Sequence, residues 1–457
     1  MPTLPLTLQR GAAPLTAQLA DQVRELCASG ALSAGHRMPS TRALAAELGV
    51  SRSVVEQAYD QLVAEAWLEG RRGAGTFVAA TAGIRPRSSG PGAPPRSART
   101  APAGPVVRLD AGTPWIDPRH AAGWRRAWRE VSTATAPRGY DDPRGLPALR
   151  VALADRLART RGLVVDPEEL VVTCGTTDGL RHLLGAVPPG PVGVEDPGYR
   201  AAVETARAQG RPVRDLPATL PLGEEQLHGL SAVYTTPAHQ HPLGRVMGAA
   251  ERTTLLGAAA TTGAVVVEDD YDSEFRYDVA PVPALAALDR EHVAYLGTAA
   301  KSVAPSLRLG WLVPPPALGP AVERRRAITH DAAPWPVQRA FLALLREGYL
   351  DRVVRSARRV YAERAPRVAA ALAPHAEAAG PSAGMYSTWL MPHDRAVAAR
   401  ESALAGGYQV NLLADYCRSS PLTGLVVGFG GVTDTELDTA LALLVRGLEQ
   451  AQAPKSR

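Results

Sequence analysis

The stretch "GTAAKSVAPSLRLG", residues 297–310, holds one of only two lysines in a chain of 457 residues. The other, Lys455, lies close to the C-terminal end, and the remaining 48 of the 50 basic side chains are arginines. An arginine stays protonated at biological pH, whereas a desolvated lysine loses its proton and attacks a carbonyl to form a Schiff base. Lys301 is therefore a candidate nucleophile, although a compositional bias toward arginine would also leave a stray lysine.

Groups suited to hold a phosphate stand near this lysine and after another predicted strand. Thr298 precedes the lysine by three residues and Arg308 follows it by seven, which provides a hydroxyl and a guanidinium. In "TCGTTDGL", Gly175, Thr176 and Thr177 follow a strand and open a helix, where free amides and the helix dipole favour an anion. Ordinary helix capping explains the second group equally well, and a plain surface charge explains the arginine.

Groups suited to an aromatic ring follow two further strands. In "VVVEDDYDSEF", Asp269 would pair with a protonated ring nitrogen and Tyr271 with a ring oxygen, although clustered acids also simply face solvent. Tyr199 in "EDPGYR" is placed to stack on a ring. Together with Lys301 these pieces describe one ligand, a phosphorylated pyridine aldehyde. The sequence thus predicts pyridoxal 5'-phosphate (PLP), held as an internal aldimine on Lys301.

Short apolar runs that alternate with helical stretches must position these groups. The runs are "ELVVTCG", "PVGVED", "SAVYTTP", "AVVVEDD", "VAYLGT" and "RLGWLVPP". Continuous apolar runs of this length indicate strands buried on both faces, and hence an α/β fold with a mainly parallel sheet and crossover helices. Functional groups in such sheets gather at the strand ends, where the residues named above stand.

The pattern of the first 80 residues predicts a separate small helical domain. "STRALAAELGVSRSVVEQAYDQLVAEAWL" gives two helices separated by a short turn, with Ser51 placed to cap the second. This is a helix-turn-helix pattern, and "WLEGRRGAGTFVA" adds a two-stranded wing. A recognition helix would present its outer face to the major groove of DNA. That face holds Arg52, Ser53, Glu56 and Gln57. A helical packing module without DNA contacts is the alternative.

Residues 81–105 are dominated by Pro, Gly, Ser, Ala and Arg, which predicts a flexible linker. We therefore expect a DNA-binding head at residues 1–80, a linker at 81–105 and a large body at 106–457. The net charge is +5, and residues 1–105 hold 11 arginines against 7 acids, so +4 of it is N-terminal. This excess is weak support for a nucleic-acid partner, because a solvated charged face explains it as well.

Several patterns exclude other classes of protein. No apolar run approaches the roughly 18 residues of a membrane span, and the N-terminus lacks the pattern of a signal peptide. The three cysteines are too widely spaced to predict a disulfide framework or a zinc site. We expect a cytoplasmic protein that holds no metal and does not associate with a membrane.

The stretch "MPSTRALAAELGVSRSVVEQAYDQLVAEAWLEGRRGAGTFV" resembles the winged helix-turn-helix of GntR-family bacterial repressors. The resemblance implies that double-stranded operator DNA is the partner of the head. By position, the DNA-contacting residues would be Arg42, Arg52, Ser53, Val54 and, in the wing tip, Gly73. Glu56 departs from family members that carry a basic residue there, so the operator preference of those members does not transfer.

The body resembles fold type I aminotransferases, from "GYDDPRGLPALR" to the C-terminus, and the tandem with the head is similar to the MocR subfamily of GntR regulators. Blocks typical of that subfamily recur as "HQHPLG", "EDDYDSEF" and "LGTAAK". The resemblance implies a small C-terminal α+β subdomain and a head-to-tail homodimer. It assigns the pyridine nitrogen to Asp269, the 3'-oxygen to Tyr271, the aldimine to Lys301, and the phosphate to Arg308, Thr176, Thr177 and Thr298.

Two positions depart from the pattern of working aminotransferases. Where those enzymes carry an asparagine that bonds the 3'-oxygen of the cofactor, this chain has His241. Where they carry an arginine that clamps the substrate carboxylate, "GLVVGFGG" places Val426. A bidentate arginine supplies both orientation and energy. Binding of an amino acid in the transaminase pose therefore requires another arginine, such as Arg339 or Arg126.

Three functions remain open at this point. The first is a transcription regulator that binds an operator through the head and senses PLP, or an amine or amino acid that reacts with PLP, through the body. Exchange at Lys301 would then alter the spacing of two heads on DNA. The second is an active aminotransferase with an accessory head, for which Lys301, Asp269 and Tyr271 would suffice at least for slow half-transamination. The third is a regulator for which PLP itself is the signal.

Overall fold

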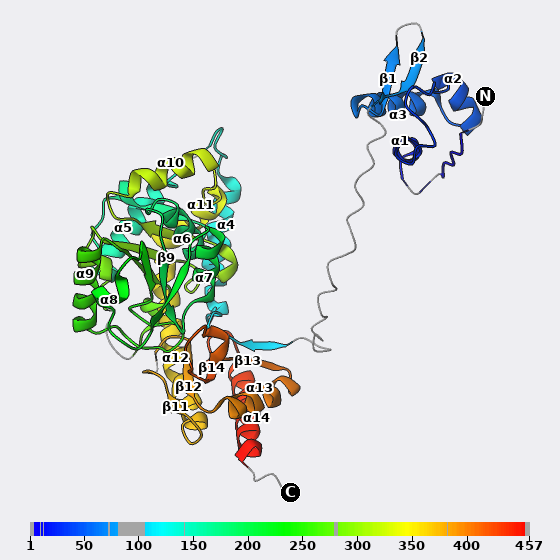
Figure 1. The fold of residues 1–457 in the computed structure, drawn as a ribbon. Helices are drawn as coiled ribbons and strands as arrows, with labels where there is room; N and C mark the ends of the chain where they lie inside the picture. The colour runs from blue at the N-terminus through cyan, green and yellow to red at the C-terminus, as the bar shows by residue number, and fades with distance from the viewer. Residues whose placement is uncertain are drawn as a thin grey trace. The chain divides into compact units, whose positions relative to one another are not determined.

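A computed structural model describes residues 4–9, 11, 13–71, 74–80, 106–140, 142–277, 282–381 and 383–452 (Figure 1). The chain separates into two compact units, Met1–Ala101 and Pro102–Arg457, and each is described by itself below. The linker expected at residues 81–105 lies outside the described residues. Among the described helices, none combines the length and the apolar character needed to cross a membrane.

The N-terminal unit is a winged helix-turn-helix. It contains the helices α1 (Leu15–Ala28), α2 (Thr41–Leu48) and α3 (Arg52–Ala64) and the antiparallel wing strands β1 (Leu68–Arg71) and β2 (Gly75–Val78). Ser40 caps α2 by accepting a hydrogen bond from Ala43 N at 3.2 Å, and Gly49 ends it in the left-handed conformation, at φ 64°. Apolar side chains from every element meet in one core.

Ser51 departs from the expectation for its side chain. It is the N-cap residue of α3, but its hydroxyl makes no capping bond to the main chain. Instead the hydroxyl lies 2.9 Å from that of Ser53, so the predicted side-chain cap is wrong.

The C-terminal unit is built on a seven-stranded, mainly parallel sheet, as the sequence predicts. Its strand order is β4-β10-β9-β8-β7-β5-β6; β5 to β9 run parallel, and β10 is antiparallel to both of its neighbours. The strands are β4 (Val171–Thr173), β5 (Val192–Asp196), β6 (Val213–Pro217), β7 (Ala232–Thr235), β8 (Val265–Asp270), β9 (Val293–Thr298) and β10 (Gly310–Val313). Of these, β6 was not among the runs from which the sheet was predicted.

Alternate residues of these strands feed two separate cores, one on each face of the sheet. In β7, for example, Val233 packs in one core while Ala232 and Tyr234 pack in the other. This burial on both faces explains why the strands read as continuous apolar runs. The helices that cover them are α4 (Ala121–Thr133), α5 (Pro147–Arg161), α6 (Thr176–Leu184), α7 (Arg200–Ala208), α8 (Glu224–Leu227), α9 (Ala249–Thr262), α10 (Gly319–Thr329) and α11 (Trp335–Arg346).

A smaller mixed sheet gathers at one end of this unit with two of its C-terminal helices (Figure 1). Its strand order is β11-β12-β14-β13-β3, with β3 parallel to β13. The first strand of the unit thus joins the C-terminal sheet. This pairing brings the residues after β3 close to the end of the large sheet where β8 and β9 terminate. The elements are β3 (Val107–Leu109), α12 (Tyr349–Leu372), β11 (Glu377–Ala378), β12 (Tyr386–Leu390), α13 (His393–Ala405), β13 (Tyr408–Leu412), β14 (Gly424–Gly428) and α14 (Asp434–Gln452).

Candidate ligand pocket and DNA-binding head

One cavity of about 550 Å³ lies where the large sheet's strands end, a size typical of small-molecule sites. The ten residues that the sequence assigned to a cofactor all line it, although they come from five separate stretches of chain. They are Gly175, Thr176, Thr177, Tyr199, His241, Asp269, Tyr271, Thr298, Lys301 and Arg308. Their gathering is a fact of the structure, while their roles toward a cofactor stay predictions.

Lys301 lies in the turn after β9 and reaches into this cavity. Its Nζ donates a hydrogen bond to the main-chain oxygen of Gly112 at 2.6 Å. Burial lowers the pKa of Lys301, while the charges of Asp272, Asp110 and Asp269 act in the opposite direction. A lowered pKa increases the share of neutral amine, which is the form that attacks a carbonyl.

Asp269 is the penultimate residue of β8, and among the described residues one of its carboxylate oxygens has a hydrogen-bond partner while the other has none. Tyr234 donates its hydroxyl hydrogen to Oδ2, whereas Oδ1 is buried and makes no hydrogen bond to the described chain. Burial raises the pKa of Asp269 to about 7, against the opposing effect of the hydrogen bond from Tyr234. A buried acceptor without a donor is unfavourable, so a ligand that brings a protonated nitrogen would stabilise this carboxylate.

An anion cradle occupies another wall of the cavity. Gly175 takes φ +105° just before α6, and a Cβ there would lie 3.6 Å from the guanidinium of Arg308. The positive φ favours glycine at this position, and the guanidinium lies in van der Waals range of the helix start, where main-chain amides point outward. The hydroxyls of Thr176, Thr177 and Thr298 line the same cavity. Among the described residues no ion pair neutralises this arginine.

His241 stands at the centre of an aromatic wall. Its ring meets four tyrosine rings edge-on, with centroids 5.2 to 5.9 Å away, and these are Tyr199, Tyr271, Tyr386 and Tyr416. Burial lowers the pKa of His241 to about 3, and the nearby lysine charge acts in the same direction. The imidazole is therefore neutral at physiological pH and has one N–H to donate.

A buried network of hydrogen bonds holds the hydroxyl of Tyr271. Its hydroxyl donates to the main-chain oxygen of His239 at 3.0 Å and lies 2.8 Å from the hydroxyl of Tyr386. His239 Nδ1 in turn lies 2.7 Å from Asp272 Oδ2, and both side chains are buried. This network fixes the phenol against the cavity wall before any ligand arrives.

The arginine clamp of aminotransferases has no counterpart at the expected place. Val426 is fully buried in the small sheet and does not line the cavity. The two suggested substitutes lie elsewhere in this chain: Arg126 pairs with Glu347 at 2.6 Å, and Arg339 pairs with Glu130 at 3.4 Å. Neither lines the cavity, so the expectation that one of them replaces the clamp is wrong for the pocket of this chain.

Sequence reasoning missed several residues that line the cavity. Tyr234 lies in a predicted strand, and its position near the strand end was a usable signal. Asp110 and Gly112 stand 191 and 189 residues before the lysine they approach, and no local pattern marks them. Arg200 and Tyr416 also line the cavity, and only the folded chain shows that they share it.

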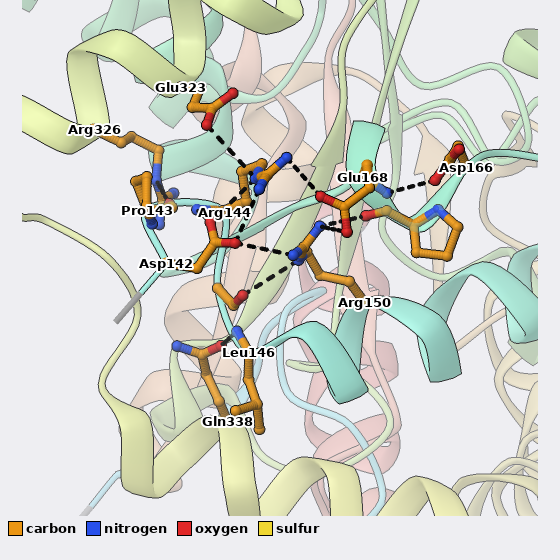
Figure 2. Close-up of polar contacts among 12 residues, drawn as sticks. Asp142, Pro143, Arg144, Leu146, Arg150, Asp166, Glu168, Glu323, Arg326 and Gln338 are labelled. Atoms are coloured by element: carbon orange, nitrogen blue, oxygen red, sulfur yellow. Dashed lines mark hydrogen bonds and ion pairs between the residues drawn. The ribbon is translucent and has the colours of Figure 1, made fainter. Parts of the chain in front are cut away.

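Residues 142–150 of the block "GYDDPRGLPALR" are held by an ion-pair network beside the large sheet (Figure 2). Arg150, with 1% of its side chain exposed, contacts Asp142 at 3.0 Å and Glu168 at 3.1 Å. Arg144 contacts the same two carboxylates, at 3.1 and 2.7 Å, with 24% of its side chain exposed. Gly145 is required here, because a Cβ would stand 2.6 Å from Val172 and the residue takes φ +99°.

The head presents most of its predicted DNA-contacting residues to solvent. Arg42, Arg52 and Ser53 are exposed and Val54 is half-buried, whereas Gly73 lies outside the described residues. Arg52 forms an ion pair with Glu56, one turn further along α3, at 2.7 Å. Glu56, where some family members carry a basic residue, therefore holds the guanidinium of Arg52, a predicted DNA contact, on the helix surface.

The residues that line the cavity fit PLP. The partnerless oxygen of Asp269 suits a protonated ring nitrogen, the cradle at Gly175 and Arg308 suits a phosphate, and Lys301 suits an aldehyde. Fold and site together define a class of protein: a DNA-binding head joined to an aminotransferase-fold body.

Comparisons with known proteins agree with this class. Residues 15–78 match the family "Bacterial regulatory proteins, gntR family" and residues 105–443 match "Aminotransferase class I and II", a family that typically binds PLP. The chain belongs to the MocR type of GntR-family transcription regulators, with an aminotransferase class I and II domain. It is thus a DNA-binding helix-turn-helix regulator.

Two curated relatives are similar to this chain over most of their length. The HTH-type pyridoxine biosynthesis transcriptional regulator PdxR of Corynebacterium glutamicum is 32% identical over 93% of this chain and 94% of its own. The probable rhizopine catabolism regulatory protein MocR of Rhizobium meliloti is 35% identical over 79% of this chain and 77% of its own. An archaeal alanine:glyoxylate aminotransferase, 24% identical, matches 76% of this chain and 92% of its own at a TM-score of 0.69, which shows the fold of the body.

Proposed function

We propose that this regulator binds PLP on Lys301 and senses PLP, an amine or an amino acid in the cavity of its body, while its head binds operator DNA. The observation that carries the proposal is the convergence of ten predicted cofactor residues on one cavity. A switch of this kind requires that the ligand favour one of two arrangements of the protein.

Different side chains of the cavity bind different parts of the cofactor. Arg308, Gly175 and the neighbouring threonines bind the phosphate, and Asp269 holds a proton on the ring nitrogen. Neutral His241 donates to the ring's oxygen beside Tyr271. When bound, PLP supplies an aldehyde that captures primary amines reversibly.

The effector would be one of two kinds. The Corynebacterium relative is a pyridoxine biosynthesis transcriptional regulator, which supports PLP itself as the signal. The volume of about 550 Å³ also supports a second molecule beside the cofactor, and hence an amine or amino acid.

A head-to-tail homodimer and three segments, at residues 1–80, 81–105 and 106–457, complete the proposal. A dimer would place two heads on two operator half-sites, and the spacing of the half-sites would report the arrangement of the heads.

An active aminotransferase is the second candidate, supported by the presence of Lys301, Asp269 and Tyr271 in one cavity. The buried Val426 at the clamp position speaks against it. Steady-state turnover with an amino donor and a keto acid, together with no binding to DNA from the protein's own upstream region, would favour the enzyme over the regulator.

Borohydride reduction tests the cofactor assignment. Reduction of the PLP-loaded chain, followed by peptide mapping, should place a stable pyridoxyl label on Lys301. A Lys301→Ala variant should lose both the label and the visible absorbance band of the loaded protein. A label on Lys455, or a variant that keeps its band, would refute the assignment.

A further inference from the structure

A second arginine lines the cavity, apart from the cradle of Arg308. Arg200 is the first residue of α7, follows Tyr199 directly, and is exposed. No ion pair or side-chain hydrogen bond holds its guanidinium within the described parts of the chain. An arginine that faces a ligand cavity without a carboxylate partner is available to a ligand.

Besides Asp269, two other carboxylates line the same cavity, and both accept hydrogen bonds from their own loops. Asp110 accepts hydrogen bonds from the amide of Gly112 at 2.8 Å and from the hydroxyl of Thr113 at 2.9 Å. Asp415 accepts one from the amide of Leu412 at 3.2 Å. Within the described residues, neither of these two acids forms an ion pair with Arg200.

A phenol lines the same cavity as this guanidinium, because Tyr416 and Arg200 are both among its lining residues. Burial raises the pKa of Tyr416, so its hydroxyl keeps its hydrogen at physiological pH. Asn411 Nδ2 donates to the hydroxyl oxygen of Tyr416 at 2.7 Å, so the hydroxyl keeps its own hydrogen for another acceptor. A guanidinium beside a free O–H donor is suited to a carboxylate.

We propose that Arg200 binds the carboxylate of the effector and makes the cavity selective for amino acids over simple amines. This inference rests on the proposed function, because it places the effector's amine toward Lys301 and its carboxylate toward α7. It assigns to Arg200 the recognition that Val426 does not provide.

Matched pairs of probes isolate the contribution of the carboxylate. The PLP-loaded full chain is titrated with β-alanine and with ethylamine, and then with 4-aminobutyrate and with propylamine, while the cofactor's visible band is followed. Each amine lacks only the carboxylate of its partner. The wild-type chain should bind at least one acid about tenfold more tightly than the matched amine, as expected for one charge-assisted contact.

Three variants complete the test. Arg200→Ala should weaken binding of that acid about tenfold and of its matched amine less than about twofold, and Arg200→Lys should fall between the two because a point charge remains. Arg207→Ala is the control, because Arg207 lies on the same helix but pairs with Glu204 at 2.9 Å outside the cavity. It should behave as wild type.

The outcomes separate this inference from the function on which it rests. Equal losses for acid and amine in Arg200→Ala, the same losses in Arg207→Ala, or a wild-type chain with no preference for an acid would each overturn it while the cofactor band persists. A wild-type chain that shows no cofactor band would instead overturn the proposed function.

Discussion

Replacing Asp269 by asparagine should change how the stability of the PLP-free chain depends on pH. Burial holds the pKa of this carboxyl at about 7, well above its ordinary value of 3.8. Because the folded-state pKa is raised, the stability associated with the neutral carboxyl is present at low pH. It is lost as pH rises from about 4 through about 7. Asparagine carries no charge at any of these pH values and removes this loss.

The two pKa values set the size of the effect. With 3.8 in the unfolded chain and about 7 in the folded chain, ionisation of Asp269 opposes folding by about 1.5 kcal/mol at pH 5 and by about 4 kcal/mol at pH 8. The advantage of Asp269→Asn over wild type should therefore grow by about 2.5 kcal/mol between these two pH values.

Denaturant unfolding followed by tryptophan fluorescence measures this difference, since six of the seven tryptophans lie in the C-terminal unit. The exposed Asp155, replaced by asparagine, serves as the control and should show no such growth. The reasoning is refuted if the gap between wild type and Asp269→Asn is the same at pH 5 and pH 8, or if it shrinks as pH rises.

Three other changes test separate parts of the structure. Arg150→Ala removes a buried partner of two carboxylates and should lower the free energy of unfolding by about 3–5 kcal/mol, against about 1 kcal/mol for the more exposed Arg144→Ala; equal losses in denaturant unfolding would contradict the role of burial. Glu56→Gln should free the arginine beside it, tighten binding to duplex DNA and steepen the slope of log K against log salt by about 0.9. Asp60→Asn on the same helix should leave the slope unchanged, and a flat response to the first substitution would count against that ion pair. His241, with a pKa of about 3, should show no titration of its ring proton in NMR spectra between pH 5 and 8; a midpoint in that range would contradict its burial beside a positive charge.

The fold was predictable to a large extent because its signals are local. The valines that open β8 in "AVVVEDD" form an apolar run because this strand is buried on both faces, and that burial is what the pattern reports. The strand β6 was missed because "VRDLP" at the sheet edge mixes exposed and buried positions and reads as loop. Ser51 is the N-cap residue of α3 as expected, but its side chain makes no capping bond because the neighbouring hydroxyl of Ser53 competes for it.

The site was predictable only where it follows strand ends. Asp269 and Lys301 come directly after apolar runs, so their convergence in a parallel sheet follows from topology. Gly112 and Tyr416 come from segments attached to the small sheet, and they reach the cavity because β3 pairs with β13 across about 300 residues of sequence. No local pattern encodes such pairing. The same limit explains why Arg126 and Arg339 were suggested as clamps although their partners lie outside the cavity.

Coupling between Lys301 and the DNA-binding head is the central claim, and DNA affinity measures it most directly. Fluorescence anisotropy of a labelled duplex from the protein's own upstream region, at one stated salt concentration, gives the dissociation constant with and without PLP. PLP should change this constant at least about fivefold for the wild-type chain and less than about twofold for Lys301→Ala. An equal response of both chains, or no response of the wild-type chain, would contradict the account.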